Sequence, residues 1–491
     1  MNLSPINIFL RVPHEIACDS RQKTRYCRRQ ALSLLLLSIL TAGTFLPILR
    51  RMVDNVVLQE RTKYIPLMLI APPTDYAAHS ALVELMRREK RLTVPHPLYH
   101  LLVLGVQQVY ECFSSPPRLA PKDATDIAIR QAAKVAPGSR AVLVTLVQKY
   151  RVSVLIVGIT CLQFTAILIY LFLRRIFPAS CPAAWPEIAS VSFAWASMIV
   201  APLFLFAHND HLFYLGYIGV NVLHNPTMLL VKPLAFVWFL WGVYAIRDRS
   251  GSDDARVPKS PDSTSWTTIC GVGMLGILAT LAKPSFSICI VPALAFMTLW
   301  QIMTGRSALL RCKLLFFGTI FPATLILMGQ FFWQYGQPKQ VTSGPTYSIA
   351  FQPLGAVRSW SEHVLWKGWL SIVFPLIVTL LFPKSVWQSI RLKLAWLVFF
   401  ISASQFYLLS EEGREGNGNF TWGAQIALFI LFISCLELIL GRLKSAAPGG
   451  TVHVAYWRTR VCLLAFACHF AAGIIYYIHI MRGNRLIDFY N

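Results

Sequence analysis

The chain has 491 residues, of which 55% are hydrophobic and only 14% charged, and its formal net charge is +23. Soluble domains carry about a quarter charged residues, so this composition excludes an ordinary soluble protein and predicts an all-α polytopic membrane protein. No basic patch with interleaved aromatic residues is present, and we therefore expect no nucleic-acid partner. The 11 cysteines form no Cys-x-x-Cys pair, so neither a zinc site nor a disulfide framework is indicated.

The N-terminal segment, 1–30, is polar and basic, and we expect it to stay in the cytoplasm because basic flanks fix the orientation of a span. The apolar run 31–49 lacks a convincing small-residue cleavage site, so it is predicted to be the first transmembrane helix rather than a signal peptide. Arg50 and Arg51 follow it, and we expect their side chains to reach the membrane interface.

A long segment, 50–150, is predicted to be an external loop. Within it, 75–90 places its apolar residues on one helical face, and 95–112 is an apolar stretch interrupted by histidine, glutamine and glutamate. We expect both to be juxtamembrane amphipathic helices lying along the membrane surface. In the alternative topology 95–112 crosses the membrane, and a further crossing is then needed near 212–223.

The rest of the chain, 151–480, alternates apolar runs with short polar or basic segments and is predicted to be a transmembrane helical domain. Spans are expected at 152–173, 185–206, 227–245, 265–282, 286–303, 314–333, 368–382, 394–409, 422–440 and 461–480. With the first helix these make about eleven transmembrane helices, with the N-terminus inside and the tail, 481–491, outside. The external loops are then 207–225, 334–367 and 411–421. No internal repeat is visible, which disfavours an inverted-repeat transporter.

This topology collects the unusual polar residues on the external side, where polar groups close to a membrane are costly and usually functional. They are Asp75, His79, His96, His100, His208, Asn209, Asp210, His211, His224, Asn225, Lys283, Glu411, Glu412, Arg414 and Glu415. Asp75 is the leading candidate for a general base, because a carboxylate can deprotonate a hydroxyl acceptor and a helix N-terminus favours negative charge. A simple helix cap would use the same residue. His79, one turn later, fits a metal or phosphate ligand or an ordinary interfacial histidine.

Lys283 interrupts the apolar sequence LATLAKPSFSICIVP, so it needs a partner or access to the interface. A lipid phosphate suits its ammonium group, and a lysine that merely reaches the interface is the alternative. His224 and Asn225 precede Pro226 at a helix start whose free N–H groups can receive an anion, although Pro226 also has a purely structural explanation there. Lys232, deeper in the same helix, also requires a partner.

The segment EEGREGNGNF, 411–420, holds three carboxylates, an arginine and three glycines. The glycines allow the backbone to approach a ligand, and Arg414 can bind a phosphate or pyrophosphate through two N–H groups. We therefore add Glu411, Arg414 and Asn419 to the candidate donor-binding residues, which also include His96. A solvated turn is the simpler explanation of the same segment.

The first part of the chain is predicted to contain one span, a long external loop with an aspartate near its first interfacial helix, a second interfacial helix and a span ending in LFLRRIF. This order of elements resembles the GT-C superfamily of integral membrane glycosyltransferases. This superfamily includes protein O-mannosyltransferases and the aminoarabinose transferases of lipid A. The resemblance covers 31–175 best. It implies that Asp75 is the catalytic or metal-binding acid of the first external loop, that 95–112 is the second juxtamembrane helix, and that the donor is a polyprenyl-phosphate-linked sugar.

The acidic pair common in that superfamily is absent, because Tyr76 follows Asp75, and a second acid would have to be a residue such as Asp210 or Glu411. We therefore name no metal ligand and no certain cofactor, and a divalent metal, Mg²⁺ or Mn²⁺, stays an open alternative.

The resemblance implies an inverting glycosyltransferase in a bacterial inner membrane, surrounded by membrane lipids, with its active site facing the periplasm and a glycan, lipid or protein as acceptor. One alternative is a transporter or flippase, which predicts charges at mid-membrane and a symmetric fold. Another is a polysaccharide polymerase or ligase of the O-antigen type, whose large external loop would lie later in the chain. A scaffold subunit with a decayed site is a further alternative.

Overall fold

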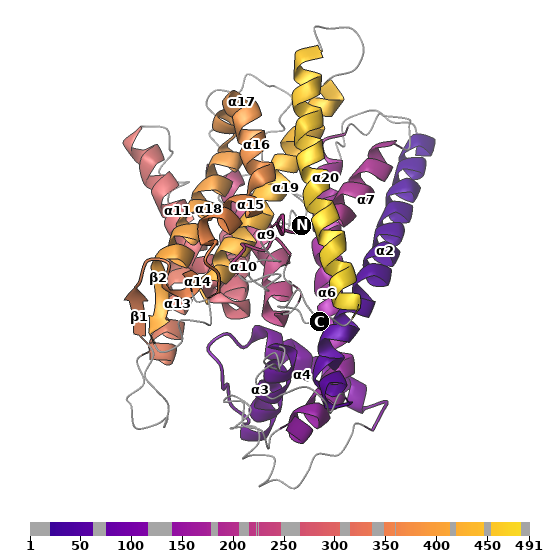
Figure 1. Cartoon of the computed structure of the whole chain (residues 1–491), viewed down its shortest axis with the longest axis vertical. Coiled ribbons are helices and arrows are strands. Elements are labelled where there is room, and N and C mark those ends of the chain that lie inside the picture. The colour runs from indigo at the N-terminus through magenta and orange to yellow at the C-terminus, as the bar shows by residue number, and fades with distance from the viewer. Residues whose placement is uncertain are drawn as a thin grey trace.

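The computed structural model describes residues 20–61, 75–115, 140–177, 185–205, 216–221, 223, 225–246, 266–304, 315–335, 348–358, 360–412, 419–445 and 453–482. These residues form a bundle of helices with one small sheet (Figure 1). The helices are α2 (Ser20–Arg61), α3 (Asp75–Glu89), α4 (Leu98–Glu111), α6 (Arg140–Arg174), α7 (Trp185–Ser197), α9 (Pro226–Ile246), α10 (Trp266–Ala282), α11 (Pro284–Met303), η3 (Phe316–Ile320), α13 (Phe321–Tyr335), α14 (Gly355–Arg358), α15 (Val364–Ser371), α16 (Val373–Leu381), α17 (Pro383–Gln388), α18 (Ile390–Leu408), α19 (Thr421–Ser445) and α20 (His453–Met481).

Within the described ranges, seven helical stretches are long and apolar enough to cross a membrane, and the count is eight if one bent pair forms a single span. The seven are Tyr26–Asp54, Val144–Arg174, Pro226–Ile246, Pro284–Met303, Phe316–Tyr335, Thr421–Leu443 and Trp457–Met481. Helices suit such a chain because they satisfy every backbone group internally, which hydrocarbon surroundings require. The protein is therefore a mainly helical, polytopic integral membrane protein.

Several observed helices end at the residues that the sequence suggested. Two expected spans are interrupted, and each of them contains a proline close to the interruption. The span expected at 185–206 is a helix only as far as Ser197, because Pro202 cannot continue it and Asn221 Nδ2 instead binds the carbonyl oxygens of Ser197 and Val200. The run 368–382 is divided between α15 and α16, which are bent by 61°. Pro375 lacks the N–H that would continue the helix across this bend.

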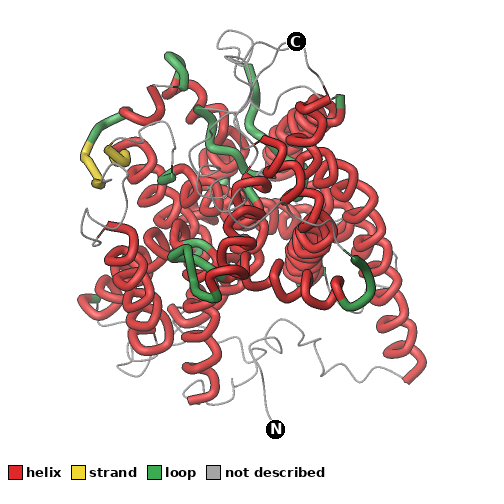
Figure 2. The backbone as a smooth tube through the Cα atoms, turned by 90° about the horizontal axis from the view of Figure 1, so that it is seen from below, coloured by secondary structure: helices red, strands yellow, loops and turns green. Residues whose placement is uncertain are grey.

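The small sheet was not expected from the sequence. Strand β1 (Ser348–Phe351) pairs antiparallel with β2 (Leu409–Glu412), with Ala350 opposite Ser410. Both strands are short, and Figure 2 shows them at the periphery of the helical bundle. The pairing fastens the segment before α14 to the chain that leaves α18.

Helices α3 and α4 lie together at one end of the bundle (Figure 1). They correspond to the two amphipathic helices that the sequence predicts at 75–90 and 95–112. Arg87 on α3 and Glu111 on α4 form two parallel hydrogen bonds of 2.6 and 2.7 Å. Helix α4 has 14 residues, so it is about 21 Å long, which is shorter than the hydrocarbon core of roughly 30 Å. It is therefore too short to cross a membrane as a single helix.

The helix pair is anchored to the bundle by buried polar contacts. Glu84 on α3 accepts hydrogen bonds from Lys149 and Tyr150 on α6, at 2.8 and 2.5 Å. The Tyr76 hydroxyl donates to the Leu223 carbonyl oxygen at 2.7 Å, and Gln330 of α13 donates to the Pro95 carbonyl oxygen at 2.9 Å. These contacts fix the position of α3 and α4 against helices that are distant in the sequence.

Candidate functional site

Asn225 is the residue on which the start of α9 depends. Its side-chain oxygen accepts hydrogen bonds from the backbone N–H groups of Thr227 and Met228, at 3.1 and 3.2 Å, which is the usual role of an N-cap asparagine. Pro226 follows at the first helical position, where its missing N–H costs nothing. The amide nitrogen of Asn225 is thereby left to make a different contact.

That contact is with Asp75, the first residue of α3. Asn225 Nδ2 donates to Asp75 Oδ2 at 2.8 Å, across 150 residues of sequence. The second carboxylate oxygen, Oδ1, accepts no hydrogen bond from the described residues, and the residue is partly exposed. Asp75 is thus held in position through one oxygen, while the other is available for a proton.

Lys283 occupies the corner between α10 and α11. Pro284 follows it, and the residue before a proline favours an extended backbone, as Lys283 adopts with φ −167° and ψ 125°. The side chain is buried, with 7% relative exposure. Its Nζ donates to Thr227 Oγ1 at 3.0 Å and lies 4.7 Å from the ring centroid of Trp422. The ammonium group is therefore paired with a hydroxyl and an aromatic ring.

Thr227 joins these residues into one unit. Its hydroxyl accepts from Lys283 and donates to Asn225 Oδ1 at 2.6 Å, and Asn225 in turn donates to Asp75. A connected series of hydrogen bonds therefore runs from a buried cation to a partly exposed carboxylate. Asp75 also attracts Lys283 electrostatically. Below, we call Asp75, Asn225, Thr227 and Lys283 the charge relay.

The loop before α9 is fixed by a second buried lysine. Lys232 donates to the carbonyl oxygen of Val220 and to Asn221 Oδ1, both at 3.0 Å, and lies 5.0 Å from the ring centroid of Phe429. The partner that the sequence required for Lys232 is thus the loop itself. This lysine supports the backbone that delivers Asn225 and takes no part in the charge relay.

Three histidines lie on the α3–α4 side of the charge relay. His79 Nδ1 and His100 Nε2 share a hydrogen bond of 2.8 Å, and the ring centroids of His96 and His100 are 6.5 Å apart. His96 Nδ1 and the hydroxyl of Tyr99 are buried without a hydrogen-bond partner among the described residues. Buried polar atoms are normally hydrogen-bonded, so these two are candidates to contact a bound molecule.

Burial keeps the three histidines neutral. It is the main cause that lowers the pKa of His96 to about 3 and that of His100 to about 4, and the pKa of His79 lies well below its ordinary value. The positive charge of Lys283 acts in the same direction on all three. At neutral pH they are hydrogen-bonding groups and do not add positive charge.

The loop candidates Glu411 and Asn419 form a separate pair. Asn419 Nδ2 donates to Glu411 Oε2 at 2.8 Å, and the Tyr335 hydroxyl donates to Glu411 Oε1 at 2.9 Å. Both carboxylate oxygens of Glu411 are thus engaged. Asn419 lies just before α19, and the ring of Trp422 near the start of that helix lies against Lys283 Nζ. The start of α19 therefore connects the Glu411–Asn419 pair to the charge relay.

The structure therefore brings together Asp75, His79, His96, Asn225 and Lys283, and leaves Glu411 and Asn419 as a separate pair. His224 and Arg414 lie outside the described residues, as do His208, Asn209, Asp210, His211 and Glu415. Sequence reasoning missed the bridging role of Thr227 and the position of Trp422. Thr227 had one usable signal, its place two residues after a capping asparagine, whereas nothing in the sequence distinguished Trp422.

The described residues do not suit a divalent metal. No group of three or more histidine, cysteine, aspartate or glutamate side chains within the described ranges has the geometry to bind one. Near Asp75 the side-chain oxygen of Asn225 is already occupied as a helix cap, and His79 and His100 bind each other. We derive no chemical step through a metal.

Comparison of the chain with models of known families, with curated proteins and with solved structures finds no match.

Proposed function

We propose that this protein is an inverting membrane glycosyltransferase of the GT-C type. It transfers a sugar from a polyprenyl-phosphate-linked donor to a hydroxyl group of a glycan, lipid or protein acceptor. The observation that carries the proposal is the charge relay, in which Lys283 is connected through Thr227 and Asn225 to Asp75. This reaction needs a base for the acceptor and a cation for the departing phosphate, and the relay supplies both.

In the proposed reaction the acceptor oxygen attacks the anomeric carbon from the side opposite the phosphate. The acceptor proton passes to Asp75 Oδ1, the oxygen that no described residue binds. The bond between the anomeric carbon and the phosphate oxygen breaks, and polyprenyl phosphate leaves with the electron pair. Lys283 stabilises the charge of the leaving phosphate as a preorganised cation.

Two unpartnered polar atoms support a sugar as the group transferred: His96 Nδ1, on a residue within electrostatic range of Lys283, and the hydroxyl of Tyr99 in α4. His96 Nδ1 and the Tyr99 hydroxyl can exchange hydrogen bonds with sugar hydroxyl groups, because a neutral histidine and a tyrosine each donate or accept. Binding a sugar would relieve the cost of leaving these buried atoms unbonded, which is about 1–3 kcal/mol for each.

We further propose about eleven spans, with α3 and α4 facing the periplasm of a bacterial inner membrane. Basic residues at the helix ends remote from α3 and α4 support this orientation, because most described basic residues on the α3–α4 side are in ion pairs with Asp54, Glu84, Glu89 or Glu111. Arg174, Lys384, Arg391 and Arg442 lie near helix ends on the side of the bundle opposite α3 and α4 (Figure 1), and basic residues favour the cytoplasmic side.

The decisive experiment replaces Asp75 with asparagine, which keeps the size of the side chain but removes the base. Membranes containing the variant are given a panel of polyprenyl-phosphate sugars, and transfer to endogenous acceptors is measured. We expect transfer to fall by about 10²- to 10⁴-fold, the usual contribution of a general base. Glu89→Gln on the same helix is the matched control, because Glu89 makes only an exposed ion pair with Arg91. Normal transfer by the Asp75→Asn variant would remove the proposal.

A binding measurement separates the role of the cation from that of the base. Purified variants are titrated with undecaprenyl phosphate, the lipid phosphate without its sugar. Lys283→Gln should weaken binding, whereas Asp75→Asn should not, because only the lysine is assigned to the phosphate. Equal affinity in wild type and Lys283→Gln would contradict the assignment of Lys283.

A further inference from the structure

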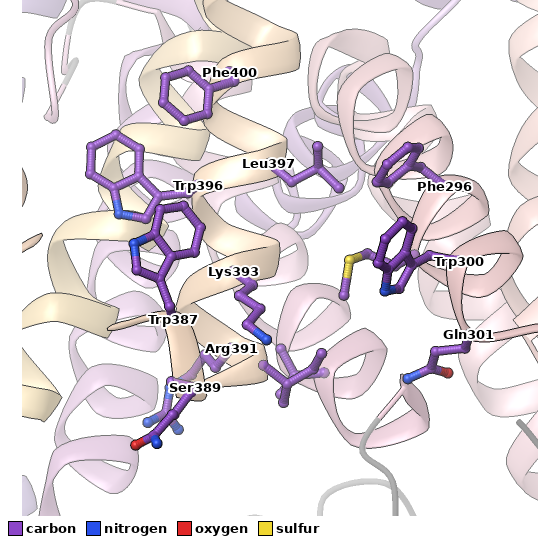
Figure 3. A pocket seen from close by; sticks show the side chains of 14 residues that line it. Phe296, Trp300, Gln301, Trp387, Ser389, Arg391, Lys393, Trp396, Leu397 and Phe400 are labelled. Carbon is purple, nitrogen blue, oxygen red and sulfur yellow. The ribbon is translucent and has the colours of Figure 1, made fainter. Parts of the chain in front are cut away.

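A cavity of about 970 Å³ lies at the end of the bundle opposite the charge relay. Figure 3 shows its two walls, one formed by Phe296 and Trp300 of α11 and the other by Trp387 of α17 and by residues of α18. The volume is in the range typical of small-molecule sites, roughly 300–1,000 Å³. The cavity is therefore large enough for part of a lipid-sized ligand.

The walls of the cavity are aromatic and open to the surroundings of the bundle. Phe296, Trp300, Trp387 and Phe400 are each a little more than half exposed, at 53–55%. In a membrane-spanning chain such side chains contact acyl chains, and tryptophan in particular is enriched at the level of the lipid headgroups. The opening thus faces lipid rather than an aqueous channel.

The interior of the cavity is cationic. Lys393 extends from α18 into the space between the walls (Figure 3) and makes no ion pair with a described carboxylate. Arg391 also lines the cavity. Its guanidinium pairs with Glu437 and lies 5.2 Å from the ring centroid of Phe172, but its Nε is buried without a hydrogen-bond partner among the described residues.

Among the residues that the structure describes, positive charge exceeds negative charge around this cavity. Arg175 lies within electrostatic range of both Arg391 and Glu437, and its guanidinium is 5.3 Å from the Phe172 ring centroid. Glu437 therefore lies within electrostatic range of two arginines, and no described carboxylate forms an ion pair with Lys393. A cavity with a net positive interior and lipid-facing aromatic walls is complementary to an amphiphile with an anionic head.

We infer that this cavity binds an anionic phospholipid, with its phosphate at Lys393 and its acyl chains against Phe296, Trp300 and Trp387. The lysine supplies a point charge for the phosphate, and the guanidinium of Arg391, held by Glu437, adds positive charge to the cavity wall. Zwitterionic lipids carry a balancing positive headgroup, so the net positive interior selects against them. The site uses no residue of the charge relay and stands independently of the proposed transferase activity.

The test uses the full-length protein in phosphatidylcholine nanodiscs that contain a minor fraction of phosphatidylglycerol. Native mass spectrometry counts the phosphatidylglycerol molecules that stay bound to the wild type and to Lys393→Glu. We expect the variant to weaken phosphatidylglycerol binding about tenfold, since it loses the attraction of the lysine for the anionic headgroup and adds the repulsion of the glutamate. Lys384→Glu is the control, because Lys384 is exposed on α17 at the same end but does not line the cavity.

A second measurement locates the lipid. Phosphatidylglycerol with brominated acyl chains should quench tryptophan fluorescence in the wild type, and part of this quenching should disappear when Trp300 and Trp387 are both replaced by phenylalanine. These residues are half exposed, so the double variant keeps its fold. If Lys393→Glu fails to fold, this double variant carries the test.

Three results would overturn the inference. One is equal retention of phosphatidylglycerol and phosphatidylcholine by the wild type. Another is equal loss of phosphatidylglycerol in Lys384→Glu and Lys393→Glu, which would indicate general surface charge. The third is displacement of the lipid by millimolar inorganic phosphate, which would assign the cavity to a soluble anion.

Discussion

The two ends of the bundle use positive charge in opposite ways. At the α3–α4 end, Lys283 is buried and bound to Thr227, and hydrogen bonds continue through Asn225 to a carboxylate. At the other end, Lys393 projects into an open cavity and makes no ion pair with a described carboxylate. Burying a charge without partners is expensive, so Lys283 needs its hydroxyl and aromatic neighbours when no phosphate is bound, whereas Lys393, partly exposed in an open cavity, does not.

This difference predicts how each end responds to substitution. A change in the charge relay leaves other buried groups without partners, so it should affect both stability and activity. A change in the cavity removes contacts to lipid and should leave the fold intact. The following experiments test that distinction, beginning with the largest expected effect.

Asn225→Asp should have the largest effect. The carboxylate can still cap α9 with one oxygen, but its other oxygen would face Asp75 Oδ2. In the wild type that oxygen accepts a hydrogen bond from Asn225 Nδ2 at 2.8 Å. Two carboxylates at that distance repel each other, and we expect a loss of roughly 2–4 kcal/mol in the free energy of unfolding together with loss of transfer. Thermal unfolding in detergent and the transfer assay measure the two effects, and a fully active, stable variant would show that the Asn225–Asp75 contact does not matter.

Gly423→Ala tests the packing that places Trp422 against Lys283. A Cβ at Gly423 would lie 2.7 Å from the Ser285 carbonyl oxygen, so α19 would have to move away from α11. We expect a loss of about 1–3 kcal/mol, as in other overpacked cores. Gly329→Ala in α13 is the matched control, because nothing lies within 4 Å of the added atom. Similar melting temperatures for the two variants would contradict the close packing at Gly423.

Acid should destabilise the α3–α4 end through its buried histidines. Their folded pKa values, about 3 for His96 and about 4 for His100, lie below the ordinary value of 6.5. Between pH 6.5 and these folded pKa values, the histidines of the unfolded chain therefore bind more protons than those of the folded protein. The free energy of unfolding falls as the pH is lowered from about 6.5 towards 4. The slope is at most about 1.4 kcal/mol per pH unit for each neutral histidine. Unfolding measured against pH should show a shallower slope in His96→Gln, and an unchanged slope would mean that His96 does not contribute.

Lys393→Ala should have the smallest effect on the fold. The side chain lines an open cavity, so we expect the free energy of unfolding in lipid-free detergent to change by less than about 0.5 kcal/mol. Added phosphatidylglycerol should raise the melting temperature of the wild type more than that of the variant. A large loss of stability without lipid would instead indicate that Lys393 has a structural partner.

The sequence predicted the helices better than the contacts between them. Long apolar runs specify α9, α11 and α20 directly, since only a helix satisfies its backbone in hydrocarbon. Two strands escaped notice because they are four residues long and lie in segments expected to be loops. Helix α7 was expected to continue to Phe206 because apolar residues do, but Pro202 lies in that run.

Parts of the candidate site were visible in advance for simple reasons. Lys283 stood out as a charge in an apolar sequence, and Asn225 stood out because a capping residue before a proline is recognisable. The contact between Asn225 and Asp75 could not be predicted, because a single sequence contains no information about pairing across 150 residues. The same limit hid the contact of Trp422 with Lys283, since tryptophan is common in apolar helices.

The peripheral position of α13 has a consequence for handling the protein. Among the seven candidate spans its stretch is the least covered by the rest of the chain, with 22% of its residues buried. Gln330 nevertheless connects it both to Thr280 of α10 and to Pro95, next to His96. Detergent that replaces the lipid around this outermost helix will therefore disturb the histidine segment as well, so the thickness and composition of the bilayer help to set the geometry of the candidate site.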